Sequence, residues 1–190
     1  MLKSPYSIIL GSQSPRRKEL LQGMDIPFSV RVIETDETYP QSLNARDVPE
    51  FLAVEKGKAH LSQLNENELV ITSDTVVICE NEILGKPKDR PQAMAMLQKL
   101  SGKSHAVVTG VCLTTTQKTV SFSDTTTVHF KTLSEAQINY YIDTYKPFDK
   151  AGGYGIQEWI GYVGISAIEG SYFNVMGLPV ARLFDVLEEF

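Results

Sequence analysis

Short apolar runs rich in β-branched residues recur along this chain and predict the strands of a sheet. The longest run covers residues 69–79 and is β-branched almost throughout, as is typical of a strand covered on both faces. A shorter run over residues 6–10 ends at Gly11. The same kind of pattern predicts further strands at residues 28–33, 104–116, 119–131 and 159–168.

Stretches with helical periodicity lie between these strands. The predicted helices begin near residues 15, 48, 90, 135 and 180. Asp47 and Ser134 each open a motif with the spacing of a capping box. In the helix after Asp47, the apolar stripe includes Glu55 and has Lys56 at its margin. Because no linker or repeat interrupts the chain, we expect one domain over residues 1–190.

Composition narrows the class of protein. The 190 residues are 42% hydrophobic and 22% charged, as in ordinary globular domains. The net charge of −5 argues against a general nucleic-acid or anionic-membrane surface, so any anion site must be local. Cys79 and Cys112 have no metal-site spacing, and no run approaches the roughly 18 apolar residues of a membrane span. We therefore expect a soluble, cytoplasmic protein that contacts neither nucleic acid nor membrane.

The first strand leads into a helix whose start carries an unusual charge. Ser14 and Pro15 fit the N-cap and the first helical position. Arg16 and Arg17 follow in the first turn, where the helix dipole disfavours a cation by roughly 0.3–1 kcal/mol each. A bound phosphate would remove this conflict, since guanidinium groups and backbone N–H groups both suit its oxygens. The alternative is a surface turn with two solvated arginines.

Charged residues elsewhere add candidate chemistry. Asp74 lies inside the apolar run 69–79, where a carboxylate needs a cation, a metal or hydrogen bonds. Residues 34–37 carry three carboxylates that could bind a hard cation, although such a cluster is often a solvated loop. If residues 83–87 return as a hairpin, Lys86 comes back towards the level of Asp74. Lys56 could equally extend from its helix to solvent.

Several motifs occur together in a fixed order. They are Ser12-x-Ser14-Pro15-Arg16-Arg17, Leu52-Ala53-x-x-Lys56, Ser73-Asp74-Thr75-Val76-Val77, Gly85-Lys86-Pro87, Thr109-Gly110-Val111 and Asp149-Lys150-Ala151-Gly152-x-Tyr154-Gly155-Ile156-Gln157. In this order they resemble the Maf family of nucleoside triphosphate pyrophosphatases over nearly the whole chain. The resemblance implies an α/β fold: an elongated mixed β-sheet flanked by helices, with two lobes around a cleft, akin to the inosine triphosphate pyrophosphatases. It also implies a metal-dependent hydrolase that splits a nucleoside triphosphate into the monophosphate and pyrophosphate.

The resemblance also implies roles for single residues. The proton acceptor of the family falls on Asp74. Its phosphate-binding groups fall on Ser12, Ser14, Arg17, Lys56 and Lys86. Its base-selecting positions fall on Arg16, Thr75 and Gln157. The Tyr-Gly-Ile-Gln ending resembles the branch that acts on dTTP and UTP.

A divalent metal, magnesium or manganese, would take oxygen ligands, and Asp74, Glu37 and Asp36 are the candidates. A carboxylate is a weak base, so Asp74 would act on a water acidified by the metal or would be a metal ligand. The Gln157 amide offers one donor and one acceptor, which match O4 and N3–H of uracil or thymine. Because an amide can also turn to suit cytosine, a second fixed group must hold it.

The resemblance leaves three readings of function. The first is a dTTP and UTP pyrophosphatase that limits non-standard or excess nucleotides. The second is the same chemistry on a modified purine nucleotide. The third is a nucleotide-binding regulator of cell division with weak hydrolysis. The predicted hairpin over residues 104–131 further hints at a homodimer, because exposed strand edges need cover.

Overall fold

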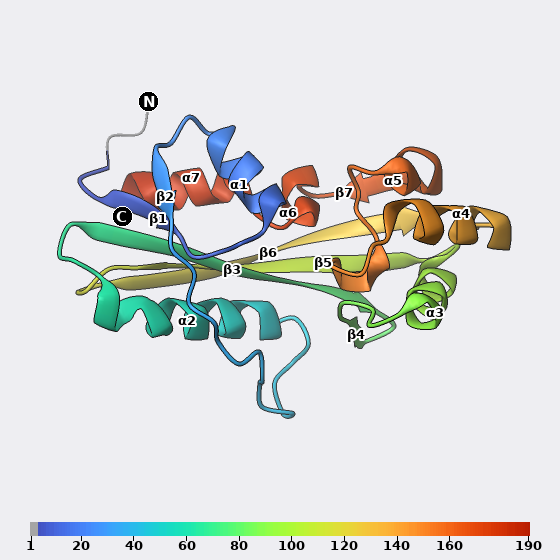
Figure 1. Cartoon of the computed structure of the whole chain (residues 1–190), viewed down its shortest axis with the longest axis horizontal. Coiled ribbons are helices and arrows are strands. Elements are labelled where there is room, and N and C mark those ends of the chain that lie inside the picture. The colour runs from blue at the N-terminus through green and yellow to red at the C-terminus, as the bar shows by residue number, and fades with distance from the viewer. Residues whose placement is uncertain (1–3) are drawn as a thin grey trace. The chain divides into compact units, whose positions relative to one another are not determined.

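Seven strands form one mixed sheet in the part of the chain that the structure, a computed structural model, describes, namely residues 4–190 (Figure 1). Their order is β2-β1-β3-β5-β6-β7, and β4 pairs with β3. The strands are β1 (Ser7–Leu10), β2 (Phe28–Val30), β3 (Glu68–Cys79), β4 (Glu82–Leu84), β5 (Ser104–Thr114), β6 (Thr119–Phe130) and β7 (Ile165–Glu169). β1 is parallel to both β2 and β3, whereas β4 and β7 are antiparallel to their neighbours. The predicted mixed α/β fold is confirmed.

The chain divides into two compact units. The first comprises Met1–Asp74, Thr109–Asp124 and Gly177–Phe190, and the second comprises Thr75–Val108 and Thr125–Met176. The boundaries fall inside β3, β5 and β6, so these three strands belong in part to each unit. The single domain expected over residues 1–190, with two lobes around a cleft, stays a prediction.

Helices α1 (Pro15–Gln22), α2 (Val48–His60) and α7 (Val180–Glu189) belong to the first unit. There α2 covers one face of the sheet, and α1 and α7 cover the other (Figure 1). The close approach of α2 depends on Gly110 of β5, because a Cβ at this position would overlap the backbone of Pro49 and Glu50. The Thr72 hydroxyl fixes the same helix by donating to the Ala53 carbonyl at 2.7 Å.

The second unit carries α3 (Arg90–Leu100), α4 (Glu135–Tyr145), α5 (Trp159–Gly164), α6 (Tyr172–Met176) and a 3-10 turn (Ala151–Gly153). The capping box predicted at Ser134 is present with both of its hydrogen bonds. The hairpin predicted after β3 is also present, and its register pairs Val77 with Leu84. Among the described residues, no helix is long and apolar enough to cross a membrane.

Two predicted strands differ in the structure. Residues 159–168 were expected to be one strand, but Trp159–Gly164 is helical and only Ile165–Glu169 is strand. A strand would place Ile160, Tyr162 and Gly164 on one face, but Ile160 and Gly164 are buried and Tyr162 is 82% exposed, as a helix allows. β2 ends at Val30 instead of residue 33, because its partner β1 ends at Leu10, which is paired with Val30.

Two expectations for α2 were also wrong. Asp47 makes no capping hydrogen bond with its side chain, and the Glu50 carboxylate instead accepts from the Ser121 hydroxyl at 2.7 Å. Glu55 is not in the buried stripe: its side chain is 40% exposed and pairs with Lys58 at 2.6 Å. The buried positions of the helix are Val48, Pro49, Leu52, Ala53, Gly57 and His60.

The long β5–β6 hairpin does not form a free arm. β5 lies between β3 and β6, and β6 lies between β5 and β7, so both strands are inside the sheet. Thr115 and Lys118 close the turn between them, the Thr115 N–H donating to the Lys118 carbonyl at 2.8 Å. The homodimer therefore gains no support from this hairpin and stays a prediction. Neither Cys79 nor Cys112 is in a disulfide.

Candidate active site

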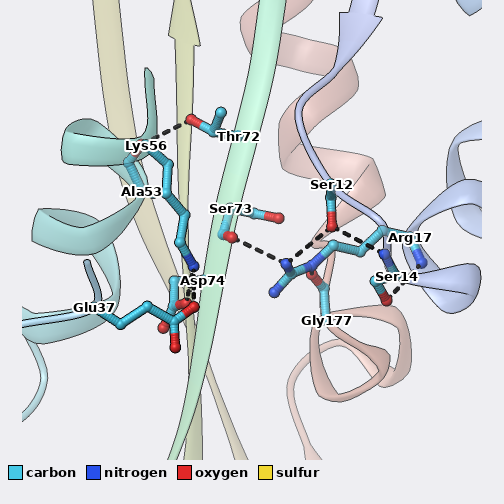
Figure 2. Close-up of polar contacts among 10 residues, drawn as sticks. All are labelled: Ser12, Ser14, Arg17, Glu37, Ala53, Lys56, Thr72, Ser73, Asp74 and Gly177. Carbon is cyan, nitrogen blue, oxygen red and sulfur yellow. Dashed lines mark hydrogen bonds and ion pairs between the residues drawn. The ribbon is translucent and has the colours of Figure 1, made fainter. Parts of the chain in front are cut away.

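The loop between β1 and α1 is organised by two serine hydroxyl groups (Figure 2). Gly11 follows the last residue of β1, and its N–H donates to the Ile71 carbonyl of β3 at 2.8 Å. The Ser12 hydroxyl then accepts the Ser14 N–H at 3.2 Å, and the Ser14 hydroxyl accepts the Arg17 N–H at 3.5 Å. Ser14 is thus the N-cap of α1, as predicted, with Pro15 at the first helical position. Both hydroxyl groups still have a proton to donate to a ligand.

The Arg17 side chain, on the first turn of α1, contacts two other segments of the first unit. Its Nε donates to the Gly177 carbonyl at 2.9 Å, and its Nη1 donates to the Ser73 carbonyl at 3.0 Å. The same Nη1 also lies 3.4 Å from the Ser12 hydroxyl (Figure 2). Burial lowers the pKa of the Arg17 guanidinium from its ordinary value, and the Asp74 carboxylate partly offsets this effect. Arg17 therefore ties the start of α1 to the residue that precedes Asp74 in β3.

Asp74 and Glu37 converge on one ammonium group. The Lys56 Nζ lies 2.5 Å from Asp74 Oδ1 and 2.8 Å from Glu37 Oε1 (Figure 2). The side chains of Lys56 and Asp74 are only 16% and 14% exposed, whereas that of Glu37 is 53% exposed. The carboxylate inside the apolar strand therefore has the cation that burial requires. Lys56 does not extend to bulk solvent.

The arrangement of these carboxylates fits a divalent cation in part. Among residues 4–190 no group of three or more His, Cys, Asp or Glu side chains gathers as a preformed metal cage. Mg²⁺, however, usually binds through one or two carboxylates, several waters and the phosphates of its substrate. Asp74 and Glu37 meet this requirement, because oxygen atoms from both already converge on a single positive charge.

Asp36 is placed differently from Glu37. It lines a pocket of about 490 Å³ beside α2. The other lining residues are Thr35, Thr38, Tyr39, Pro40, Phe51 and Glu55. The structure thus brings Glu37 to Lys56 and Asp74, whereas the neighbouring Asp36 lines this pocket.

The remaining predicted site residues belong to the second unit, apart from Arg16 at the start of α1. Thr75 follows Asp74 in β3, and Lys86 is an exposed residue two positions after β4. Gln157 is partly buried, and its Oε1 is buried without a hydrogen-bond partner among the described residues. A buried amide oxygen that lacks a donor suits a ligand N–H, because a hydrogen bond would offset the cost of its burial.

Sequence reasoning missed the partners of Arg17. They are the carbonyl groups of Ser73 and Gly177, and a backbone carbonyl leaves no signal in the residue type. It also treated Lys56 as a phosphate ligand or as a lysine that extends to solvent, whereas the structure pairs it with two carboxylates. The sequence did contain a signal for that pairing. It placed a lysine at the margin of a buried helix face and an aspartate inside a buried strand, and each of these charges needs a partner.

Comparison with known proteins matches this chain to a family. The family model described as Maf-like protein matches residues 7–190. The chain belongs to the Maf family. The match runs through both compact units, and the resemblance inferred from the short motifs is confirmed.

Relatives in this family cover almost the full length of the chain. A protein of Parabacteroides distasonis named dTTP/UTP pyrophosphatase is 51% identical over 186 residues, which are 97% of this chain and 96% of that protein. A protein of Phocaeicola vulgatus with the same name is 52% identical over 185 residues, with the same coverage of 97% and 96%. One from Flavobacterium psychrophilum, again so named, is 51% identical over 177 residues, covering 93% and 91%.

A solved structure supports the fold of this Maf family member. The HAM1 protein of Coxiella burnetii matches with a TM-score of 0.53 and covers 97% of this chain and 100% of its own. The two sequences are only 14% identical, so this likeness concerns the fold alone. It agrees with the mixed α/β fold that the sequence predicts.

Proposed function

We propose that this protein hydrolyses dTTP and UTP to the nucleoside monophosphate and pyrophosphate, and so limits excess or non-standard nucleotides. The observation that carries the proposal is the convergence of Asp74 and Glu37 on Lys56. The names of relatives about 50% identical over nearly the full chain support the choice of substrate.

Asp74 is the proposed proton acceptor. In the reaction, the water oxygen forms a bond to the α phosphorus, and Asp74 takes the water proton. The bond from this phosphorus to the bridging oxygen breaks, and pyrophosphate leaves. The contact with Lys56 holds the carboxylate in one orientation. A divalent cation held by Asp74 and Glu37 would make the water more acidic and screen the charge of the triphosphate.

The phosphate side is proposed to use the start of α1. Ser12 and Ser14 offer hydroxyl protons, and Arg16 offers a guanidinium at a helix N-terminus, where anions are favoured. Lys56 and Lys86 are further cations for this purpose. Arg17 uses three of its donor contacts within the protein, so we assign it to the positioning of this loop and of β3.

The base is proposed to be read by Gln157, together with Thr75 and Arg16. The buried Oε1 of Gln157 needs a donor, and N3–H of uracil or thymine supplies one. This pairing favours a pyrimidine with an imide over cytosine, whose N3 is an acceptor. The regulator reading and the modified-purine reading remain as outcomes of the test.

The test is pyrophosphate release from dTTP, UTP, CTP, GTP, 7-methyl-GTP and ITP, each with magnesium, with manganese and with EDTA. We expect metal-dependent release from dTTP and UTP. In Asp74→Asn, turnover should fall by about 10³-fold while nucleotide binding changes only a few-fold. Nucleotide binding without release by the wild-type protein would favour the regulator instead, and release from 7-methyl-GTP alone would favour the purine reading.

A further inference from the structure

The segment that carries Gln157 is a closed turn in the second unit. The Glu158 N–H donates to the Gly155 carbonyl at 3.0 Å, so Ile156 and Gln157 are the two central residues. Both ends of this turn meet the hydroxyl of Tyr141 on α4. That hydroxyl accepts the Gly155 N–H at 2.9 Å and donates to Oε2 of Glu158.

A lysine completes this arrangement from the other side. The Lys150 Nζ lies 3.1 Å from Oε1 of Glu158 and 2.7 Å from Oδ1 of Asp149. The side chains of Lys150 and Glu158 are 10% and 19% exposed. The Glu158 carboxylate is thus held by a hydroxyl on one oxygen and by an ammonium on the other. Burial and, as the next largest cause, the hydrogen bond to Glu158 raise the pKa of Tyr141 far above its ordinary value. The hydroxyl therefore keeps its proton and remains a donor.

The turn is also closely packed. A Cβ at position 155 would lie 2.9 Å from Cδ of Glu158 and 3.1 Å from Cε of Lys150. Gly155 therefore lets the carboxylate and the lysine stem lie directly over the turn. Movement of either side chain would change the space above the backbone that carries Gln157.

The Gln157 amide itself is not fixed through its oxygen. Its buried Oε1 has no hydrogen-bond partner in the part of the chain that the structure describes. An amide can present either its oxygen or its nitrogen to a ligand after a half-turn about its last torsion. The backbone turn sets where this amide lies, and the contacts that set the turn come from Tyr141 and Glu158.

We propose that Tyr141 and Glu158 are positioning residues for base selectivity. They hold the Gly155–Glu158 turn so that the Gln157 amide oxygen faces an N–H donor of the base, as in uracil and thymine, and not an acceptor, as in cytosine. This inference rests on the proposed function, because it assumes that Gln157 reads the base. It assigns selectivity to two residues that need not touch the nucleotide.

The decisive variant is Tyr141→Phe, which removes both hydrogen bonds and keeps the ring. With purified full-length protein, kcat and KM are measured for UTP and CTP by pyrophosphate release. The ratio of kcat/KM for UTP over CTP should fall about tenfold, mainly through a higher KM for UTP, with kcat for UTP within about threefold of wild type. Binding of UMP and CMP by calorimetry should show the same loss of preference.

Tyr145→Phe is the matched control. Its ring stacks on Tyr141 with centroids 5.2 Å apart, and the variant removes a hydroxyl from the same helix without touching either bond to the turn. It should keep the wild-type ratio. Glu158→Gln keeps an acceptor for Tyr141 and should hold the ratio within about threefold, whereas Glu158→Ala should behave like Tyr141→Phe.

Three results would overturn the inference. In the first, Tyr141→Phe lowers thermal stability, or slows both nucleotides equally, while the ratio stays within about twofold of wild type, which indicates a purely structural role. In the second, Glu158→Gln and Glu158→Ala lose the same selectivity, so that the acceptor for Tyr141 does not matter. In the third, the wild-type protein turns over neither nucleotide, and this result overturns the proposed function as well.

Discussion

The ammonium group of Lys56 on α2 lies 2.5 Å from Oδ1 of Asp74 in β3. Both side chains are more than four-fifths buried, with exposures of 16% and 14%. Removal of either partner would leave a charge with little water around it. The pair therefore links the stability of the first unit to the chemistry proposed for it.

Lys56→Met tests this link. The variant leaves Asp74 and Glu37 with no ammonium between them, so we expect a loss of about 1–3 kcal/mol in the free energy of unfolding and at least a 100-fold loss of turnover. Urea denaturation and pyrophosphate release measure the two effects. Lys58→Met is the control two residues along the same helix: its pair with Glu55 is 60% and 40% exposed, so the change should be under about 0.5 kcal/mol. Equal effects of the two variants would contradict the prediction.

Glu37 and Asp36 are adjacent in sequence and should differ in function. Glu37→Gln should lower turnover at least about 100-fold and raise the concentration of magnesium needed for half-maximal rate, because one of two converging carboxylates is lost. Asp36→Asn should change either quantity by less than about threefold, since Asp36 lines the pocket beside α2. A magnesium titration of both variants at saturating dTTP measures the maximal rate and the concentration for half-maximal rate. The reverse order of effects would assign the metal to Asp36.

Arg17 should not be replaceable by lysine. An ammonium cannot reach the carbonyl groups of Gly177 and Ser73 with the fork geometry of a guanidinium, so Arg17→Lys should lose about 1–3 kcal/mol in the free energy of unfolding. Arg46→Lys, at an exposed position in the same unit, should change stability by under about 0.5 kcal/mol. Chemical denaturation of both variants measures this difference. A tolerated Arg17→Lys would show that the carbonyl contacts contribute little.

Acid stability should depend on Glu68 at the start of β3. Arg31 forms two hydrogen bonds with this carboxylate, at 2.7 and 3.1 Å, and lowers the pKa of Glu68 to about 2. Because the pKa is lower in the folded state, the contribution to stability is complete above the unfolded pKa of about 4.5 and is lost as the pH falls through about 2.

Denaturation of wild-type protein and Glu68→Gln across this range tests the prediction. The stability difference between them should be constant at neutral pH and should shrink between about pH 5 and pH 2. Glu66→Gln, at an exposed position two residues earlier, should lose stability at acid pH over the same range as the wild-type protein. A difference that does not change with pH would rule out a role for this ion pair in acid stability.

Much of the fold could be predicted from residue patterns. The β-branched run of β3, the capping box of α4 and the serine and proline before α1 are local signals, and each was read correctly. The helix α5 was read as a strand, because residues 159–168 mix apolar residues with glycine and carry no clear period. The segment is helical because tertiary packing buries Ile160 and Gly164.

The site was harder to predict than the fold. The sequence placed Asp74 in a buried strand and Lys56 on a helix, but it gave no measure of the distance between them. Helical periodicity even favoured burial of Glu55, which instead pairs with Lys58 on the surface. Contacts between elements far apart in the chain, such as Arg17 with Gly177, depend on the completed fold and have no local pattern.

The boundary between the two compact units crosses β3 between Asp74 and Thr75. The proposed proton acceptor therefore belongs to one unit, and the proposed base reader Gln157, with its turn and the residues that hold it, belongs to the other. Substitutions at Gln157 or in its turn can therefore change one contribution to nucleobase preference at positions far in the sequence from Glu37, Lys56 and Asp74. Such a division makes it easy for paralogous copies to acquire new substrates without inventing new chemistry.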